Sequence, residues 1–256
     1  MPVLAFHDID NRIIPGITNF PPVRFANLLD FLISSGYRFY NLSDYIEVTN
    51  SSCNIALTFD DGFKNFLDSA LPILAERKLP FSIFIPAGFV GKLNRWDYTY
   101  LISKREHLSA GELRGLAQAG AVIGSHGLSH QCLTDLSDRL LKIELENSKK
   151  RLEDMTGSDV AFLSYPFGRF NDKVEVYALD AGYARGFSLS SWRRSRVGFS
   201  LSRSPVYYFD TPFSVKSKIE GPLRPLENLK GRLLNAFSYG SIVYSRLLPR
   251  RWRTFE

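Results

Sequence analysis

The chain has few cysteines and no long apolar run, and each scarcity excludes a class of protein. Its two cysteines, Cys53 and Cys132, form no Cys-x-x-Cys motif and no evident zinc pair, so we expect reduced thiols. No stretch approaches the roughly 18–20 consecutive apolar residues of a transmembrane helix. With 256 residues, 45% hydrophobic and 23% charged, the composition is that of a globular protein with ample core.

The first ten residues, MPVLAFHDID, lack the features of a secretory signal peptide. They contain no basic segment, and His7 and Asp8 interrupt the apolar run. We therefore expect a cytoplasmic protein, with the inner face of the membrane as one place of action, or an exported protein if the native N-terminus is longer.

Acidic residues are scarce in two basic segments, although the net charge of the whole chain is only +6. Five arginines and no acid lie between Ala181 and Phe209. Four further arginines near the C-terminus interleave with Tyr239, Tyr244 and Trp252. A solvated basic surface is one explanation, and peripheral contact with an anionic membrane or a lipid-linked substrate is the other. No nucleic-acid motif accompanies the charge, so we expect no nucleic-acid partner.

Short apolar strands alternate with helical patterns, which predicts repeated βα units and a barrel-like domain. The strands are expected at residues 2–6, 54–59, 80–85, 121–125, 160–168, 184–189 and 204–209. Ser109 and Glu112 have the spacing of a capping box, Asn171 is expected to cap another helix, and Gly157 to end the longest one. No linker divides residues 1–210. Residues 211–256 have the weakest pattern, so we expect a basic, aromatic helical tail there.

Two adjacent carboxylates, Asp60 and Asp61, end the apolar run Ile55–Phe59 and precede a glycine. Their mutual repulsion and the cost of desolvating them require an explanation. A turn or a cap is the ordinary one. A divalent cation is the other, because its charge would offset the repulsion and leave one carboxylate to accept a proton.

Two of the four histidines, His126 and His130, follow the strand expected at 121–125 and lie four residues apart. On a helical turn this spacing places both imidazoles on one face, although a single such pair is more often surface or core. The carboxyl ends of parallel strands meet at one edge, so we expect these histidines beside the carboxylates and the segment 164–168. Two histidines and one carboxylate would hold a metal with open positions, which predicts metal-assisted hydrolysis.

The motifs TFDDG, SHGLSH and YPFG resemble those of the polysaccharide deacetylases of the NodB-homology type, carbohydrate esterase family 4, over residues 3–209. The resemblance implies a distorted (β/α)7 barrel and removal of N-acetyl groups from amino sugars. It implies that Asp60 is the general base and that Asp61, His126 and His130 bind a divalent metal. We expect Zn²⁺, with Co²⁺, Ni²⁺ or Mn²⁺ as alternatives.

Two departures from the family pattern concern the arginine that pairs with the base and the histidine that serves as general acid. Many members carry an arginine where this chain has Ser164, and Arg203 is the candidate substitute. The late histidine that usually serves as general acid is also missing. His7 ends the first strand and is similar to the N-terminal histidine of the poly-N-acetylglucosamine deacetylases, which implies that it is the acid here.

Other residues have less specific expectations. His107 is expected to be exposed, just before a helix cap. Trp192 and Tyr165 are expected either to stack on sugar rings or to pack in the core. The backbone N–H near Phe167, in the turn after Pro166, is a candidate oxyanion donor.

Together these features predict a metal-dependent hydrolase that removes N-acetyl groups from an amino sugar. The substrate is expected in a polysaccharide or in a lipid- or nucleotide-linked glycan precursor of the cell envelope. Two alternatives stay open: a catalytically silent carbohydrate-binding protein, and a related amide hydrolase with a non-acetyl substrate. No GxSxG motif is present, which argues against serine-based hydrolysis.

Overall fold

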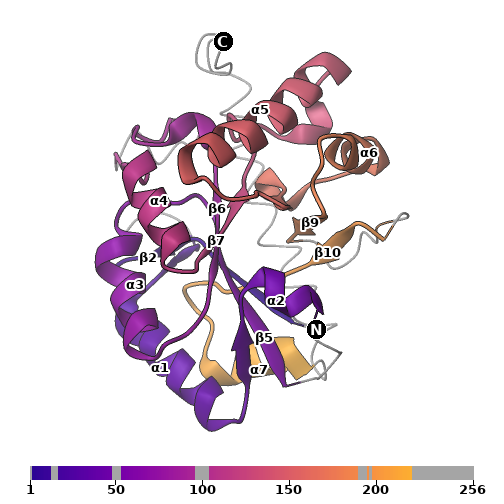
Figure 1. The fold of residues 1–256 in the computed structure, drawn as a ribbon. Coiled ribbons are helices and arrows are strands. Elements are labelled where there is room, and N and C mark those ends of the chain that lie inside the picture. The colour runs from indigo at the N-terminus through magenta and orange to yellow at the C-terminus, as the bar shows by residue number, and fades with distance from the viewer. Residues whose placement is uncertain are drawn as a thin grey trace.

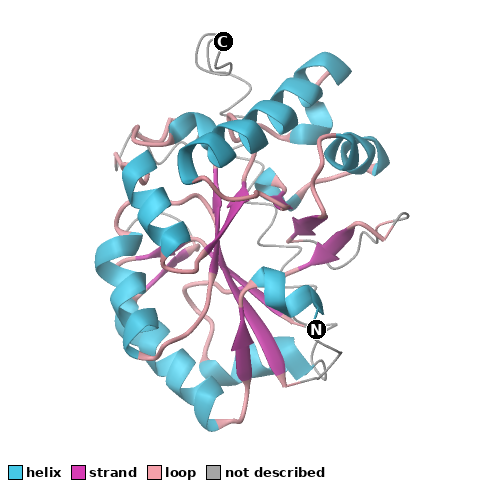
Figure 2. Ribbon diagram, viewed as in Figure 1, coloured by secondary structure: helices cyan, strands magenta, loops and turns pink. Residues whose placement is uncertain are grey.

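A parallel sheet, nearly closed into a barrel, occupies the centre of the molecule (Figure 2). The computed structural model describes residues 2–12, 17–47, 53–95, 104–189, 195 and 198–220. The strands pair in the order β10-β9-β8-β7-β6-β5-β1-β11. They are β1 (Val3–Phe6), β5 (Asn54–Phe59), β6 (Ser82–Ile85), β7 (Val122–Ser125), β8 (Phe162–Ser164), β9 (Arg185–Ser188), β10 (Ser200–Ser202) and β11 (Ser204–Pro205).

Residues 200–205 close the barrel. β10 pairs with β9 at one end of the sheet, β11 pairs with β1 at the other, and only Arg203 separates the two short strands. The Arg203 N–H donates to the Ser188 carbonyl at 2.7 Å, which holds the junction against β9. If this segment counts as one strand, the barrel has seven strand positions, as expected for a distorted (β/α)7 barrel. The strand predicted at 204–209 was too long, because Tyr207 N donates to the Asp210 carboxylate in a turn (2.8 Å).

Seven α-helices are described, and those that follow the barrel strands cover the outside of the sheet (Figure 1). They are α1 (Pro22–Ser34), α2 (Leu42–Glu47), α3 (Phe66–Glu76), α4 (Ala110–Gln118), α5 (Asp138–Thr156), α6 (Asp172–Asp180) and α7 (Pro212–Glu220). The capping box of Ser109 and Glu112 is confirmed at the start of α4. Asn171 caps α6, and Gly157 ends α5 in the left-handed conformation (φ 71°), as predicted.

Three short strands lie outside the main order of the sheet. β4 (Arg38–Tyr40) pairs with the first half of β5, and β2 (Asp8–Ile9) pairs with β3 (Asn19–Phe20) in a separate small sheet. These strands and α2 were not predicted, because segments of two to six residues are too short for a recognisable period.

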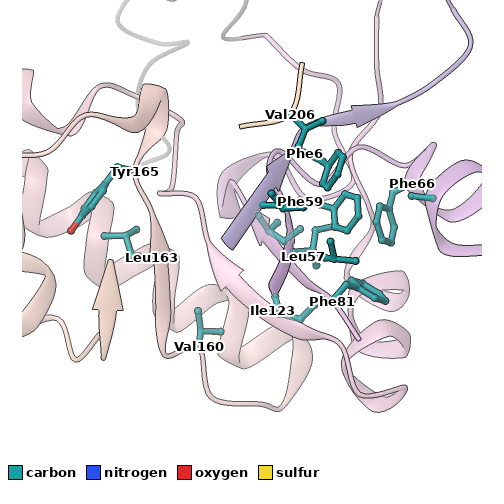
Figure 3. Close-up of a cluster of buried hydrophobic side chains, with 14 of the residues drawn as sticks. Phe6, Leu57, Phe59, Phe66, Phe81, Ile123, Val160, Leu163, Tyr165 and Val206 are labelled. Atoms are coloured by element: carbon teal, nitrogen blue, oxygen red, sulfur yellow. The ribbon is translucent and has the colours of Figure 1, made fainter. Parts of the chain in front are cut away.

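A cluster of aromatic rings fixes the strand that leads to the paired carboxylates. The ring of Phe59, the last residue of β5, stacks on Phe6 with centroids 5.5 Å apart and meets Phe66 edge-on at 5.0 Å (Figure 3). Phe25 from α1 and Phe81 complete the contacts at 5.9 and 6.1 Å. Burying a phenylalanine side chain contributes roughly 1.5–3 kcal/mol, so the end of β5 is firmly held.

Helix α7 packs on α1 (Figure 1). The Phe213 ring meets Phe31 with centroids 5.1 Å apart, Val215 and Ile219 are buried, and Tyr37 Oη donates to Glu220 Oε1 at 2.7 Å. The remainder of the expected tail, 221–256, lies outside the described residues, so its membrane contact stays a prediction. Within the part that is described, no helix combines the length and apolarity needed to cross a bilayer.

Candidate active site

Polar side chains gather at the carboxyl ends of the barrel strands. His7 follows β1, Asp60 follows β5, His126 follows β7, Ser164 ends β8 and Arg203 follows β10. Because all these strands are parallel, their ends share one edge of the barrel, which is where such folds build their sites.

Asp60 forms a buried ion pair with Arg203. The guanidinium donates from Nη1 to Oδ1 and from Nη2 to Oδ2, both at 2.7 Å. It also donates to Thr58 Oγ1 (3.0 Å) and Ser164 Oγ (2.6 Å). Burial raises the pKa of Asp60, but the charge and hydrogen bonds of Arg203, together with the neighbouring His126 and His7, outweigh burial and hold that pKa below the usual value. Asp60 is therefore ionised at neutral pH, and the side chain of Arg203 has no exposed surface.

Asp61 occupies a strained turn. Its φ of +70° lies in the left-handed region, and Gly62 N donates back to the Asp60 carbonyl at 2.9 Å. A positive φ at the central residue, with a hydrogen bond between residues two apart in sequence, defines the rare and strained form of the γ-turn. Gly62 also has positive φ (62°), and a Cβ there would lie 2.3 Å from Ile85 Cδ1, so only glycine fits.

Three candidate ligand atoms converge beside this turn. Asp61 Oδ1 lies 3.6 Å from His126 Nε2 and 3.4 Å from His130 Nε2. All three residues are buried, and one candidate ligand atom from each lies within 4.8 Å of the others. Two ligands about 2.1 Å from a tetrahedral Zn²⁺ are roughly 3.4 Å apart, so the spacing fits one ion.

The protonation of His126 supports the same fit. Its Nδ1 lies 2.9 Å from the Ser164 carbonyl, which can only accept, so Nδ1 carries the hydrogen. Burial lowers the pKa of His126 to about 4, so the ring is neutral at neutral pH. The lone pair of Nε2 then faces Asp61 Oδ1, a buried oxygen that accepts no hydrogen bond from the described residues. Two acceptors that face each other are best explained by a cation between them.

The segment that joins the two histidines is a loop, and the prediction of a helical turn was wrong. His130 has φ +55°, which no α-helix contains. The loop is held by Glu144 of α5, whose Oε2 accepts from Leu128 N (2.8 Å) and Ser129 N (3.0 Å), while Ser129 Oγ donates to Oε1. This side chain was missed, although its place among the apolar residues of α5 is a signal, since a carboxylate there needs donors.

His7 lies at the rim of the site. Its Nε2 is 4.0 Å from Asp60 Oδ2, and its side chain is 17% exposed, whereas Asp60 is buried. Of the residues predicted for catalysis, His7 is therefore the one with access to solvent, a requirement for delivering a proton to a bound substrate.

His107 is buried, contrary to the expectation of an exposed residue. Its Nδ1 lies 2.8 Å from the carbonyl oxygen of Asp61, and burial lowers its pKa to about 3. The prediction failed because the segment that carries His107 pairs across the chain with Phe63, a contact that local sequence does not encode.

The predicted substrate residues differ in accessibility. Tyr165 is fully buried, stacked on Phe170 and bonded to Ser200 Oγ (2.6 Å), so the sugar-stacking alternative is wrong for its ring. Phe167 is partly exposed, has φ +60° and meets the His130 ring edge-on at 5.0 Å. Trp192 lies outside the described residues.

Comparison with known proteins identifies relatives of this chain and of its fold. The sequence profile of the family described as polysaccharide deacetylase matches residues 47–186, more than half of the chain. YxkH of Bacillus subtilis, which is named as a polysaccharide deacetylase, is 25% identical over 202 residues, 77% of this chain and 67% of that protein. The poly-β-1,6-N-acetyl-D-glucosamine N-deacetylase of Staphylococcus aureus is 27% identical over 179 residues, 65% of this chain and 59% of that protein.

Two solved structures share the fold. IcaB from Ammonifex degensii superposes with a TM-score of 0.73 at 21% identity, covering 86% of this chain and 97% of that one. The Streptococcus pyogenes deacetylase PplD, solved with acetate, gives 0.72 at 20% identity, with 86% and 98% coverage.

Proposed function

Because the chain belongs to the polysaccharide deacetylase family, we propose that it is a metal-dependent hydrolase that removes N-acetyl groups from an amino-sugar glycan. The observation that carries the proposal is the convergence of Asp61 Oδ1 with the Nε2 atoms of His126 and His130. Such a set of two imidazoles and one carboxylate leaves coordination positions open for water and substrate.

Asp61, His126 and His130 would hold the metal, with Zn²⁺ as the ion that best suits these donors. When bound, a divalent ion lowers the pKa of a coordinated water and polarises the amide carbonyl. The Ser164 carbonyl keeps the hydrogen of His126 on Nδ1 and so keeps Nε2 available to ligate.

Asp60 is proposed as the general base. Since Arg203 holds it ionised and fixes both of its oxygens, it can accept the proton of the attacking water in a constant geometry. The water oxygen adds to the acetamide carbon. The backbone N–H of Phe167, in its left-handed turn, is the proposed donor to the oxyanion that develops.

His7 is proposed as the general acid. An amine is a poor leaving group unless it is protonated, so a proton donor is required as the C–N bond breaks. His7 lies 4.0 Å from Asp60 and is partly exposed, and protonated His7 would deliver its proton to the departing nitrogen. The products are acetate and the free amino sugar.

The proposed substrate is an N-acetylated amino sugar in a polysaccharide or in a glycan precursor. The S. aureus relative, which is named for poly-β-1,6-N-acetyl-D-glucosamine, supports a glucosamine polymer. This chain spans 59% of that relative's length, so the choice between polymer and precursor is part of the proposal.

Acetate release from N-acetylglucosamine oligomers tests the proposal. We expect Asp60→Asn to lower kcat by about 10²–10⁴-fold, the usual contribution of a general base, while the protein keeps one bound metal. Asp180→Asn, an exposed carboxylate on α6, is the matched control and should leave kcat unchanged. Metal-loaded protein that releases no acetate from any amino sugar, or full activity in Asp60→Asn, would refute the proposal.

A further inference from the structure

Asp61, which completes the candidate metal site, has a strained backbone conformation. A positive φ costs a residue with a side chain about 1–2 kcal/mol. Asp61 has φ +70° and is the central residue of a γ-turn closed by the hydrogen bond from Gly62 N to the Asp60 carbonyl. Strain of this kind persists only where the surroundings enforce it.

The His107 ring supplies such a contact. Its Nδ1 lies 2.8 Å from the Asp61 carbonyl oxygen, and because a carbonyl only accepts, Nδ1 is the donor. The ring is buried between two aromatic side chains, with centroids 4.8 Å from Phe63 and 5.7 Å from Phe89. It is therefore fixed in direction as well as in position.

The backbone around His107 is held by other hydrogen bonds. Lys64 N donates to the Glu106 carbonyl (2.8 Å), Leu108 N to the Gly62 carbonyl (3.0 Å) and His107 N to the Lys92 carbonyl (2.9 Å). These bonds do not involve the imidazole. A substitution of the ring can therefore remove its bond to Asp61 while the segment 106–108 stays paired with 62–64.

We propose that His107 is a positioning residue for the metal ligand Asp61. Its Nδ1–H holds the Asp61 carbonyl, and so keeps the residue at positive φ with its carboxylate directed at His126 and His130. If Asp61 relaxed to negative φ, its Cβ would turn and carry Oδ1 away from the two imidazoles, now 3.6 and 3.4 Å distant. This inference rests on the proposed function, since it assigns the three residues to one ion.

Two substitutions separate the hydrogen bond from the shape of the ring. In His107→Asn, the amide nitrogen can occupy the place of Nδ1 and donate to Asp61. In His107→Leu, a methyl group occupies that place, and both variants lose the same outer ring atoms. The Asn variant is thus the conservative rescue, and the difference between the two variants measures the donor alone.

The measurement is the Zn²⁺ dissociation constant of each purified variant, by competition with a chromophoric chelator, beside the Tm of each metal-free protein. We expect His107→Leu to bind Zn²⁺ about 10–100-fold more weakly than wild type, the usual effect of losing an outer contact of a ligand. His107→Asn should stay close to wild type. A merely structural role would lower the Tm of both variants and leave their Zn²⁺ affinities equal, and that result would overturn the inference.

A wild-type protein that binds no metal would refute the proposed function instead. Crystal structures of metal-free wild type and His107→Leu then decide the positioning role separately. Asp61 at negative φ in the variant alone supports it, and Asp61 unchanged in both overturns it.

Discussion

The side chain of Arg203 reaches no solvent, and its charge is balanced by Asp60. Taking two charges out of water costs several kcal/mol each, and their attraction and hydrogen bonds offset that cost only while both are present. The intact pair therefore adds little to the free energy of unfolding, whereas loss of one partner alone lowers it strongly. The difference between these two effects can be measured.

Removing the cation alone should be more damaging than removing both charges. We expect Arg203→Met to lower the free energy of unfolding by about 3–5 kcal/mol, because Asp60 is left buried and uncompensated. The double variant Arg203→Met with Asp60→Asn should recover part of that loss. Urea denaturation measures both, with exposed Arg139→Met as the surface control. Equal stability of the single and double variants would contradict the mutual dependence.

Two glycines with positive φ, Gly157 and Gly62, allow a matched comparison of alanine substitutions. Gly157 has φ 71° and an added Cβ meets nothing within 4 Å, whereas a Cβ on Gly62 (φ 62°) would lie 2.3 Å from Ile85 Cδ1. Gly157→Ala should therefore cost only the backbone term, about 1–2 kcal/mol.

Gly62→Ala should cost more than Gly157→Ala and should also weaken Zn²⁺ binding, because the clash displaces Asp61. Chemical denaturation and metal titration of both variants check this expectation. Similar losses of stability with unchanged metal affinity would count against the role of Gly62 in aiming the carboxylate.

At the scale of helices and loops, the outcome of sequence-based prediction depended on whether the determinants are local. The caps of α4 and α6 and the end of α5 were predicted because Ser109, Asn171 and Gly157 act within one turn of their helix. The conformation between His126 and His130 was not, because Glu144, sixteen residues beyond Leu128, sets it. His107 was misplaced for the same reason, since its burial depends on Phe63 and Phe89.

Helix α5 offers a test of how a distant carboxylate shapes the histidine loop. Glu144→Gln replaces a charged acceptor of two backbone N–H groups with a neutral one, and hydrogen bonds to charged groups are the stronger, so we expect a lower free energy of unfolding, by about 1–3 kcal/mol, and weaker Zn²⁺ binding. Glu146→Gln on the same helix is exposed and forms a surface ion pair with Lys142, so it should change neither quantity. Urea denaturation and chelator competition provide the readouts. If Glu144→Gln kept the wild-type free energy of unfolding and Zn²⁺ affinity, the loop conformation would not depend on Glu144.

For the whole molecule, the candidate ligands come from widely separated positions, 61, 126 and 130, so an ion that binds them should stabilise the entire barrel. At a free Zn²⁺ concentration of 100 times Kd the linkage amounts to about 2.7 kcal/mol. We expect Zn²⁺ to raise the Tm of wild type and a chelator to reverse the change. Asp61→Asn should show a much smaller shift in a thermal melt. An equal shift in that variant would place the stabilising ion elsewhere.

The barrel itself could be predicted from the alternation of strands and helices and from the three motifs, but its closure could not. The closing segment is divided into strands of three and two residues, too short for a pattern. Arg203 was selected from the sequence as a candidate only because the third motif lacks its arginine. The positions of the tail beyond 220 and of Trp192 lie outside the described residues, and the cellular location stays a prediction.

The placement of Arg203 between β10 and β11 has a consequence for biosynthesis. A nascent chain that has left the ribosome only as far as β9 already contains Asp60, Asp61, His126 and His130, but not the guanidinium that keeps Asp60 charged. Because translation runs from the N-terminus, the proposed base receives its counter-ion only when the last strand docks beside the first. The proposed hydrolytic activity would then depend on residues 200–205, which are synthesised after the residues proposed to bind the ion.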